Sequence, residues 1–389
     1  NRAVDEICGM LSDNAIDYIR IGNPYSCDKR YRSHLLTEYI EQHPNLNHIR
    51  LQLQSSQVIV GTTSTLQSKT YLFELKSFSM AIIDEASQIL EPNIVGLLAA
   101  HNEGEQVIDK FILIGDHKQL PAVVQQDNNE SAADSPLLEE IHLPNCANSL
   151  FERLILTERA AGRTDFVGTL RKQGRMHPDI AAFPNTYFYE REQLECVPLA
   201  HQTEPNQPYN EPSEDKTDDF LKAHRMVFIP SQSCRKPYIS EKVNTEEARI
   251  VADLVRRLYR QMGKTFDAQK SIGIIVPYRN QIAMIRKELE QLCLPAIDKI
   301  SIDTVERYQG SQRDVIIYSF TIQNRFQLEF LTANTFVEDG KPIDRKLNVA
   351  ITRARKQLIL TGNEATLRQN FLFSELIDYI EKRGGKTVI

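Results

Sequence analysis

Two adjacent carboxylates, Asp84 and Glu85, directly follow the short apolar run at residues 80–83. This pattern is typical of a buried parallel strand that delivers acids to the carboxyl edge of a sheet, where α/β proteins bind ligands. At such an edge, the first acid can hold Mg²⁺ and the second can orient or deprotonate a water that attacks a phosphate. A solvated acid pair at a strand end is the alternative, and the pair alone does not decide between the two.

Sequence patterns on both sides of this pair predict the strands and helices that would position it. Apolar runs at 58–60, 80–83 and 111–114, separated by helical patterns, predict a βαβ sheet in the first part of the chain. A second parallel α/β unit is expected after a join near residue 165. Its predicted strands are 226–229, 272–276, 300–304, 315–320 and 357–361, and its predicted helices are 244–262, 278–292, 347–354 and a region from 364 onward. We expect loops at 125–148 (with a short helix), at 201–219 (mobile, on the surface) and at 323–344.

The amino-acid composition restricts the classes of protein to which the chain can belong. The 389 residues are 41% hydrophobic and 25% charged, as in ordinary globular proteins that contain two or three domains. The net charge of −6 argues against a uniformly basic nucleic-acid coat, although a local basic channel stays compatible with it. The six cysteines form no Cys-x-x-Cys pair, which favours reduced thiols over a structural zinc site. No apolar run approaches a membrane span of about 18 residues. A cytoplasmic location without membrane association is therefore expected.

The order of short motifs along the chain is similar to that of superfamily 1 helicases. The match is to the 1B branch, which includes the nonsense-mediated-decay RNA helicase and its DNA-helicase relatives. This resemblance implies two tandem RecA-like parallel-sheet domains, at 1–165 and 166–389. The segments that carry it are 1–5 (motif Ia), 61–65 (Ic), 84–87 (II), 115–121 (III), 173–178 (IV), 304–314 (V) and 348–355 (VI).

The resemblance implies a nucleotide site for ATP and Mg²⁺. Asp84 would hold the metal, Glu85 would activate water, and Gln119 would contact the γ-phosphate. Arg175 and Arg353 would stabilise the charge that spreads over the γ-phosphoryl oxygens, so that hydrolysis requires the two domains to close. Three further positions would contact the nucleotide: Asp116, Gly310 and Gln312. Gly174 stands where relatives carry an adenine-stacking Tyr and Gln312 where they carry Glu, which leaves base and sugar recognition open.

A nucleic-acid partner is also implied, with translocation from 5′ to 3′ on a single strand. Backbone contacts are expected from Asn1, Arg2, Thr62, Thr63 and Thr304, although threonines are equally common in ordinary turns. DNA is only slightly favoured over RNA, because recognition of the 2′-OH depends on local geometry. We expect a monomer.

A phosphate-binding P-loop, Gly-x-x-x-x-Gly-Lys-Ser/Thr, does not occur in the 389 residues. Two short matches, at 263–265 and 385–387, lack the earlier glycine. We therefore expect the first domain to be incomplete at its N-terminus, and the chain to be the C-terminal portion of a longer helicase. Alone it should bind ATP poorly and turn none over. The alternatives are an RNA helicase of the same family and a non-catalytic nucleic-acid-binding scaffold. A nuclease would need clustered acids with a lysine or a metal-binding cysteine set, and neither is evident.

Overall fold

The computed structural model describes residues 2–205, 207, 209–233 and 240–388 and divides into two compact units. Unit 1 comprises Asn1–His117 and Pro121–Val167, and unit 2 comprises Lys118–Leu120 and Gly168–Ile389. The three residues Lys118–Leu120 thus belong to unit 2, although the chain on both sides of them belongs to unit 1. None of the helices in the described ranges is long and apolar enough to cross a membrane.

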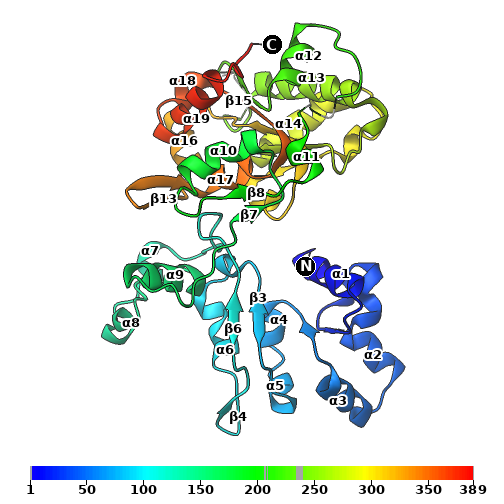
Figure 1. The fold of residues 1–389 in the computed structure, drawn as a ribbon, viewed down its shortest axis with the longest axis vertical. Coiled ribbons are helices and arrows are strands. Elements are labelled where there is room, and N and C mark those ends of the chain that lie inside the picture. Colours follow the sequence, from blue (N-terminus) through cyan, green and yellow to red (C-terminus); the bar gives the residue numbers. More distant parts are fainter. Residues whose placement is uncertain (1, 206, 208, 234–239, 389) are drawn as a thin grey trace. The chain divides into compact units, whose positions relative to one another are not determined.

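Unit 2 is built on a five-stranded parallel sheet in the order β11-β10-β12-β15-β9. Its strands read as continuous apolar runs because both faces are covered. Alternate residues of one strand enter two different cores: Phe228 packs with the helices at 178–187, 345–351 and 371–381, whereas Val227 packs with the helices at 245–262 and 279–290. The result is a helix–sheet–helix sandwich (Figure 1). The strands of the sheet are β9 (Met226–Pro230), β10 (Ile272–Val276), β11 (Ser301–Thr304), β12 (Arg313–Ser319) and β15 (Ala354–Gly362).

Ten α-helices lie in the described part of unit 2. The longest is α13, which begins after the Asn244 side chain accepts hydrogen bonds from two backbone amides of its first turn. The helices are α10 (Pro178–Tyr187), α11 (Ala200–Thr203), α12 (Lys216–Ala223), α13 (Thr245–Met262), α14 (Arg279–Glu290), α15 (Val305–Tyr308), α16 (Arg325–Leu331), α17 (Arg345–Ile351), α18 (Glu364–Leu367) and α19 (Phe371–Glu381). The two-stranded elements are β7 (Lys172–Gln173) with β8 (Glu195–Cys196), and β13 (Thr335–Glu338) with β14 (Lys341–Asp344).

Unit 1 contains two short parallel pairs, β1–β2 and β3–β6, and an antiparallel pair, β4–β5. The three predicted strands of this region are confirmed, although the hydrogen-bonded ladders are shorter than the apolar runs. The strands are β1 (Ile19–Arg20), β2 (Ile59–Val60), β3 (Ala81–Ile83), β4 (His101–Asn102), β5 (Glu105–Gln106) and β6 (Phe111–Leu113). The helices are α1 (Arg2–Asp13), α2 (Leu36–Gln42), α3 (Leu46–Ser55), α4 (Thr63–Gln67), α5 (Tyr71–Leu75), α6 (Val95–Leu98), α7 (Asn128–Ser131), α8 (Pro136–Glu140) and α9 (Leu150–Ala160).

The predicted loop at 323–344 is wrong. It contains the helix α16 and the hairpin β13–β14, whose two turn residues, Asp339 and Gly340, have φ of 51° and 75°. Asp-Gly with two positive φ values is the turn that matches the twist of a two-residue hairpin. The predicted helix at 347–354 is also too long at its end. Ala354 instead starts β15, because it pairs with Arg313 in the sheet.

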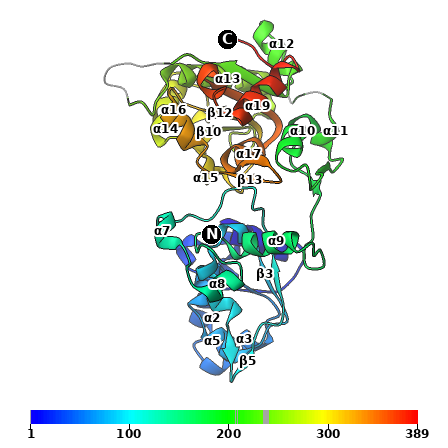
Figure 2. The ribbon, with the colours of Figure 1, turned by 90° about the vertical axis from the view of Figure 1, so that its left-hand side faces the viewer.

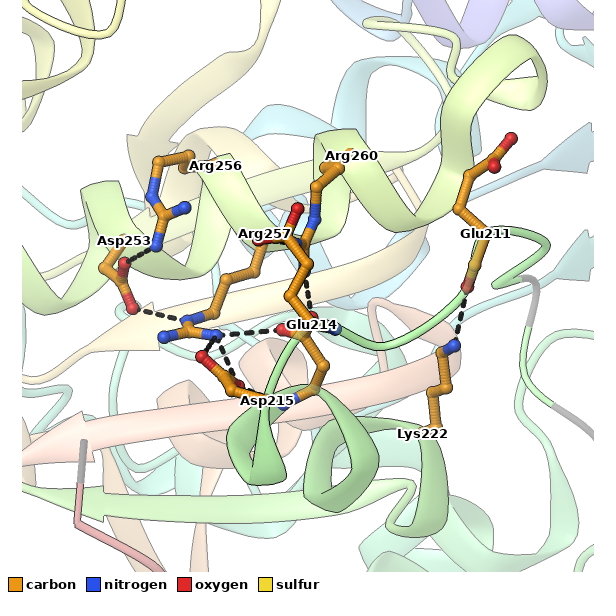
Figure 3. A network of polar contacts seen from close by, with 9 residues as sticks. Glu211, Glu214, Asp215, Lys222, Asp253, Arg256, Arg257 and Arg260 are labelled. Atoms are coloured by element: carbon orange, nitrogen blue, oxygen red, sulfur yellow. Dashed lines mark hydrogen bonds and ion pairs between the residues drawn. The ribbon is translucent and has the colours of Figure 1, made fainter.

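The mobile loop predicted at 201–219 is wrong for the residues that the structure describes at its two ends. The first end is in α11, and the second enters α12, which ion pairs attach to α13 (Figure 3). Arg257 lies between Asp253 and Asp215, with nitrogen–oxygen distances of 2.7 and 2.8 Å. Asp218 is fully buried and pairs with Arg257 at 2.9 Å and also with Arg260. Asp215 and Asp218 thus pair with arginines of one helix, and Asp218 is shielded from solvent.

Candidate nucleotide and nucleic-acid site

The acid pair of unit 1 stands where β3 ends, as predicted. Glu85 adopts the left-handed conformation (φ 52°), and its backbone N–H donates to Oδ1 of Asp84 at 2.9 Å. The next amide, that of Ala86, donates to the carbonyl of Ile114 at 2.7 Å. A non-glycine residue with positive φ is uncommon and marks a turn held by its surroundings. The turn leaves both carboxylates exposed at the strand end.

The ends of β3 and β6 are joined through Ser87. Its hydroxyl accepts a hydrogen bond from the backbone N–H of Asp116 at 3.3 Å. A Cβ on Gly115 would lie 2.9 Å from the backbone nitrogen of Ser87, so the close approach of the two turns requires glycine there. Motifs II and III therefore meet at one edge of unit 1, and Asp116 lies there with Asp84. The residue that joins them, Ser87, received no role from the sequence.

This edge has the donor chemistry for Mg²⁺ bound together with phosphates. Within the described ranges, no group of three or more His, Cys, Asp or Glu side chains is arranged to hold a metal ion. Mg²⁺ usually takes only one or two carboxylates, with waters and substrate phosphates completing its shell. The exposed carboxylate of Asp84 fits that mode of binding.

Four of the predicted nucleotide contacts come together in unit 2. Arg175 donates from Nε to Gln312 Oε1 at 3.1 Å and from Nη1 to the carbonyl of Thr352 at 3.3 Å. Arg353 donates from Nη2 to the hydroxyl of Thr352 at 2.9 Å and to Oε1 of Gln119 at 3.2 Å. The two guanidinium groups thus converge on Thr352. Because Arg353 is only 1% exposed while Arg175 is half-buried, the first is a fixed charge and the second is accessible. We call this set the arginine cluster.

Lys118 holds the segment that carries Gln119. Its buried ammonium lies 2.9 Å from a carboxylate oxygen of Glu192 and 2.6 Å from one of Glu338. Its backbone carbonyl accepts a hydrogen bond from the Asn348 side chain at 2.8 Å. Glu338 belongs to the hairpin β13–β14 that sequence reasoning missed, and the contact positions Gln119 against Arg353.

His201 forms hydrogen bonds with two arginines, one of which belongs to the arginine cluster. Its Nε2 donates to the carbonyl of Arg175 at 2.9 Å, and its Nδ1 accepts from Arg355 at 3.3 Å. Arg355 also pairs with Asp314 at 2.9 Å. His201 lies in the segment interpreted as a mobile loop, so the sequence assigned it no role. The next residue, Gln202, is only 3% exposed, but this burial comes from the fold and no local sequence pattern marks it.

His177 begins α10 in motif IV and acts as a neutral cap. Burial lowers its pKa, and the charge of Arg225 adds to this effect. The neutral ring lets Nδ1 accept a hydrogen bond from the backbone N–H of Asp179 at 3.2 Å. The remaining predicted nucleotide contact, Gly310, adopts φ 75° in the turn after α15, a conformation that suits glycine.

The predicted nucleic-acid contacts are spread over both units. Thr62 caps α4, since its Oγ1 accepts from the backbone N–H of Thr65 at 3.2 Å, and Thr63 is the first residue of that helix. Thr304 ends β11 in unit 2. Arg2 begins α1, and Asn1 lies outside the described residues. Thr62 therefore caps a helix, as threonines commonly do in turns.

Parallel α/β units, an acid pair at a strand end and a cluster of arginines are features that nucleotide-hydrolysing α/β proteins share. Two family profiles, both described as AAA domain, match residues 46–127 and 146–365. The chain therefore belongs to this AAA domain family, among the superfamily 1 helicases of the branch that includes the Dna2-type and nonsense-mediated-decay helicases.

Three curated relatives illustrate the family. The chain is 28% identical to the DNA replication ATP-dependent helicase/nuclease dna2 of Schizosaccharomyces pombe, over 98% of this chain and 25% of that protein. It is 30% identical to an uncharacterized ATP-dependent helicase of Methanocaldococcus jannaschii, over 84% of this chain and 42% of that protein. It is 30% identical to the DNA polymerase alpha-associated DNA helicase A of Saccharomyces cerevisiae, over 75% and 39%. The chain thus spans less than half the length of each.

Proposed function

We propose that the protein is the helicase part of an ATP-driven motor that translocates along single-stranded nucleic acid. The observation that carries the proposal is the arginine cluster. Two guanidinium groups from distant motifs converge on Thr352, with Gln119 on one and Gln312 on the other. Paired guanidinium groups are the donors that stabilise charge on a transferring phosphoryl group.

Each unit would contribute different groups to the reaction. In unit 1, Asp84 would hold Mg²⁺, and Glu85 would orient and deprotonate the attacking water. In unit 2, Arg175 and Arg353 would bind the γ-phosphoryl oxygens, with Gln119 oriented by its bond to Arg353. Bound Mg²⁺ would supply the positive charge that neutralises the phosphate oxygens during transfer. The exposure of Asp84 and Glu85 supports these roles, because both must reach water and a ligand.

Single-stranded DNA is the partner that we propose first, with movement from 5′ to 3′. One relative is named as a DNA helicase and another as a DNA replication helicase/nuclease, which supports DNA as the substrate, and RNA is the alternative. Arg2, Thr62, Thr63 and Thr304 are the described residues that we propose to contact the sugar-phosphate backbone of the strand.

We further propose that the 389 residues alone do not turn over ATP. A P-loop surrounds the phosphates with backbone N–H groups and a lysine, and no segment of this sequence has that pattern. The arginine cluster and the acid pair would then be present without the main phosphate-binding element.

ATP hydrolysis by the protein from its complete reading frame, with and without single-stranded DNA or RNA, tests the proposal. We expect turnover that rises with one of the strands and that the Glu85→Gln variant abolishes. The matched control is Glu105→Gln, which changes an exposed carboxylate on the hairpin strand β5 and should leave turnover unchanged. The 389-residue chain, measured beside it, should show none.

The second candidate, a non-catalytic scaffold, predicts a different result. The complete protein would bind strands without hydrolysing ATP, and Glu85→Gln would change nothing. The arginine cluster favours the motor, because a scaffold has no need for two neighbouring guanidinium groups that are each hydrogen-bonded to a glutamine.

A further inference from the structure

The carboxyl edge of the unit 2 sheet carries more than Thr304. Strands β10 and β11 are parallel neighbours, and Val276 pairs with Thr304. Tyr278 stands two residues beyond Val276, so it emerges at the same edge as the proposed strand contact. Helix α16 lies beside the start of α14 at this edge (Figure 2).

Aromatic rings are stacked there in an order from buried to exposed. Tyr278 is 8% exposed, and Phe330 of α16 is stacked on it with ring centroids 5.5 Å apart and an interplanar angle of 19°. Phe330 is itself 50% exposed, and Phe326, one helical turn earlier on the same face, is 83% exposed. Two large rings that stay at least half exposed on one helix face leave an apolar surface that a ligand can cover.

Lysines lie against two of these rings. The Nζ of Lys346 lies 4.5 Å from the centroid of Phe330 and 3.5 Å from a carboxylate oxygen of Glu306, which fixes the lysine against the ring. The Nζ of Lys242 lies 5.8 Å from the centroid of Tyr278, and this lysine is exposed. Arg279, next to Tyr278, is exposed as well. Lys242 and Arg279 can therefore meet phosphates while the rings meet something flat and apolar.

We propose that Phe326 and Phe330 form a base-stacking platform for a single strand of nucleic acid. An unpaired base offers a free π-face, and its phosphate suits Lys242 and Arg279, as in other proteins that bind single strands without sequence preference. A duplex does not fit, because its base faces are already stacked. The inference rests on the proposed function and adds residues that make the interaction depend on bases rather than on the phosphate backbone alone.

The chain contains no tryptophan, so one introduced ring becomes a unique fluorescent reporter. We would titrate Phe326→Trp with oligothymidine and expect quenching as a base stacks on the indole. Tyr259→Trp is the matched control on α13. Asn244, which caps the start of that helix, bonds to Gln281 near Tyr278. Position 259 is 15 residues further along the helix, about 22 Å away at 1.5 Å per residue, and its emission should not change.

The affinities of two variants for intact and abasic strands distinguish base stacking from charge attraction. Phe326→Ala should weaken oligothymidine binding by about tenfold and leave the binding of an abasic strand of equal length unchanged. Lys242→Gln should weaken both strands and lower the salt dependence by about one counterion. Phe326 is suited to the test because it is largely exposed, so its removal opens no cavity.

The outcomes are distinguishable from failure of the proposed function. If the wild-type chain binds oligothymidine, but Phe326→Trp emission and Phe326→Ala affinity match their controls, the platform is overturned and strand binding stands. If the wild-type chain binds neither strand, both the platform and the nucleic-acid partner are overturned.

Discussion

The strand edge of unit 1 and the arginine cluster of unit 2 position charge in opposite ways. Asp84 and Glu85 are exposed, and the turn that carries them is positioned by backbone bonds to β6. Arg353 is 1% exposed, and its guanidinium donates to the carbonyl of Val349 at 2.9 Å, to Thr352 and to Gln119. The acid pair is exposed on a turn held by backbone hydrogen bonds, whereas the Arg353 guanidinium is buried and held by both backbone and side-chain oxygens.

The difference follows from what each group is proposed to do. A carboxylate that receives a metal or a water must keep its lone pairs accessible to solvent. A guanidinium that stabilises developing charge works best when its direction is fixed in advance in a site of low dielectric constant. The two-stranded pair β3–β6 suits the first role, and the five-stranded sheet, covered on both faces, suits the second.

The largest expected effect comes from Arg175, which is the accessible member of the arginine cluster. Arg175→Gln in the complete protein should lower kcat by about 10³-fold, as expected for an arginine that stabilises a phosphoryl-transfer transition state. Its urea unfolding midpoint should barely move, because the side chain is half-buried. Arg353→Lys, at the closed position, should lower both kcat and the midpoint. Equal losses of stability in the two variants would contradict the division into accessible and fixed charges.

Lys118→Met should strongly destabilise unit 2. It removes the ammonium group that lies 2.9 and 2.6 Å from the carboxylates of Glu192 and Glu338, whose side chains are 11% and 8% exposed. Breaking a buried pair in this way typically costs about 3–5 kcal/mol. Urea unfolding followed by circular dichroism measures the loss.

Two controls separate the buried ion pair from the loss of any lysine. Adding Glu192→Gln and Glu338→Gln to Lys118→Met should recover most of the free energy of unfolding. Lys270→Met removes an exposed lysine, 3.9 Å from Asp267, and should have no measurable effect. A Lys118→Met protein as stable as the wild type would show that these carboxylates are solvated.

The contrast between the two regions also explains what could be predicted from sequence. The acid pair could be placed because the strand and the acids are adjacent in the chain, so a local pattern carries the information. The cluster residues Arg175 and Arg353 could be identified only through motif order. Their supports, Lys118, His201 and Asn348, act across long separations that no local pattern encodes.

The two elements that were not predicted, the hairpin β13–β14 and the attachment of α12, also differ in whether a local pattern marks them. The hairpin β13–β14 did have a local signal, the Asp339-Gly340 turn, which was outweighed by the weak periodicity of its short strands. The attachment of α12 had none, because its acids resemble a solvated loop until the arginines of α13 are placed opposite them.

A buried carboxylate makes the stability of unit 2 depend on pH. Burial raises the pKa of Glu247 to about 7, although Ser319 and Thr321 donate hydrogen bonds that work against this rise. The folded state therefore holds the proton more tightly than the unfolded state, whose pKa is near 4.5. Binding of this proton stabilises the folded state fully below pH 4.5. As the pH rises from 4.5 to 7, about 3 kcal/mol of that stability is lost.

Urea unfolding between pH 5 and 8 checks this dependence. Glu247→Gln should flatten the decline, whereas Asp344, whose pKa burial raises to about 6, stays in both proteins and cancels in the comparison. Unit 1 offers the opposite sign: hydrogen bonds from Arg30 lower the pKa of Asp28 to about 2, so its contribution is lost only in acid. Parallel curves for wild type and Glu247→Gln would contradict the raised pKa.

The smallest expected effects distinguish helix capping by Thr62 from the binding of a nucleic-acid strand by Thr63. Thr62→Ala should lower the free energy of unfolding by about 1 kcal/mol, because it removes the cap of α4, and Thr62→Ser should restore it. Thr63→Ala leaves that cap intact and should be stable, yet it should weaken oligothymidine binding. If Thr63→Ala binds the strand as the wild type does, while Thr62→Ala loses stability alone, the two threonines serve only to begin a helix. The strand contact of unit 1 would then have to lie elsewhere on its open edge.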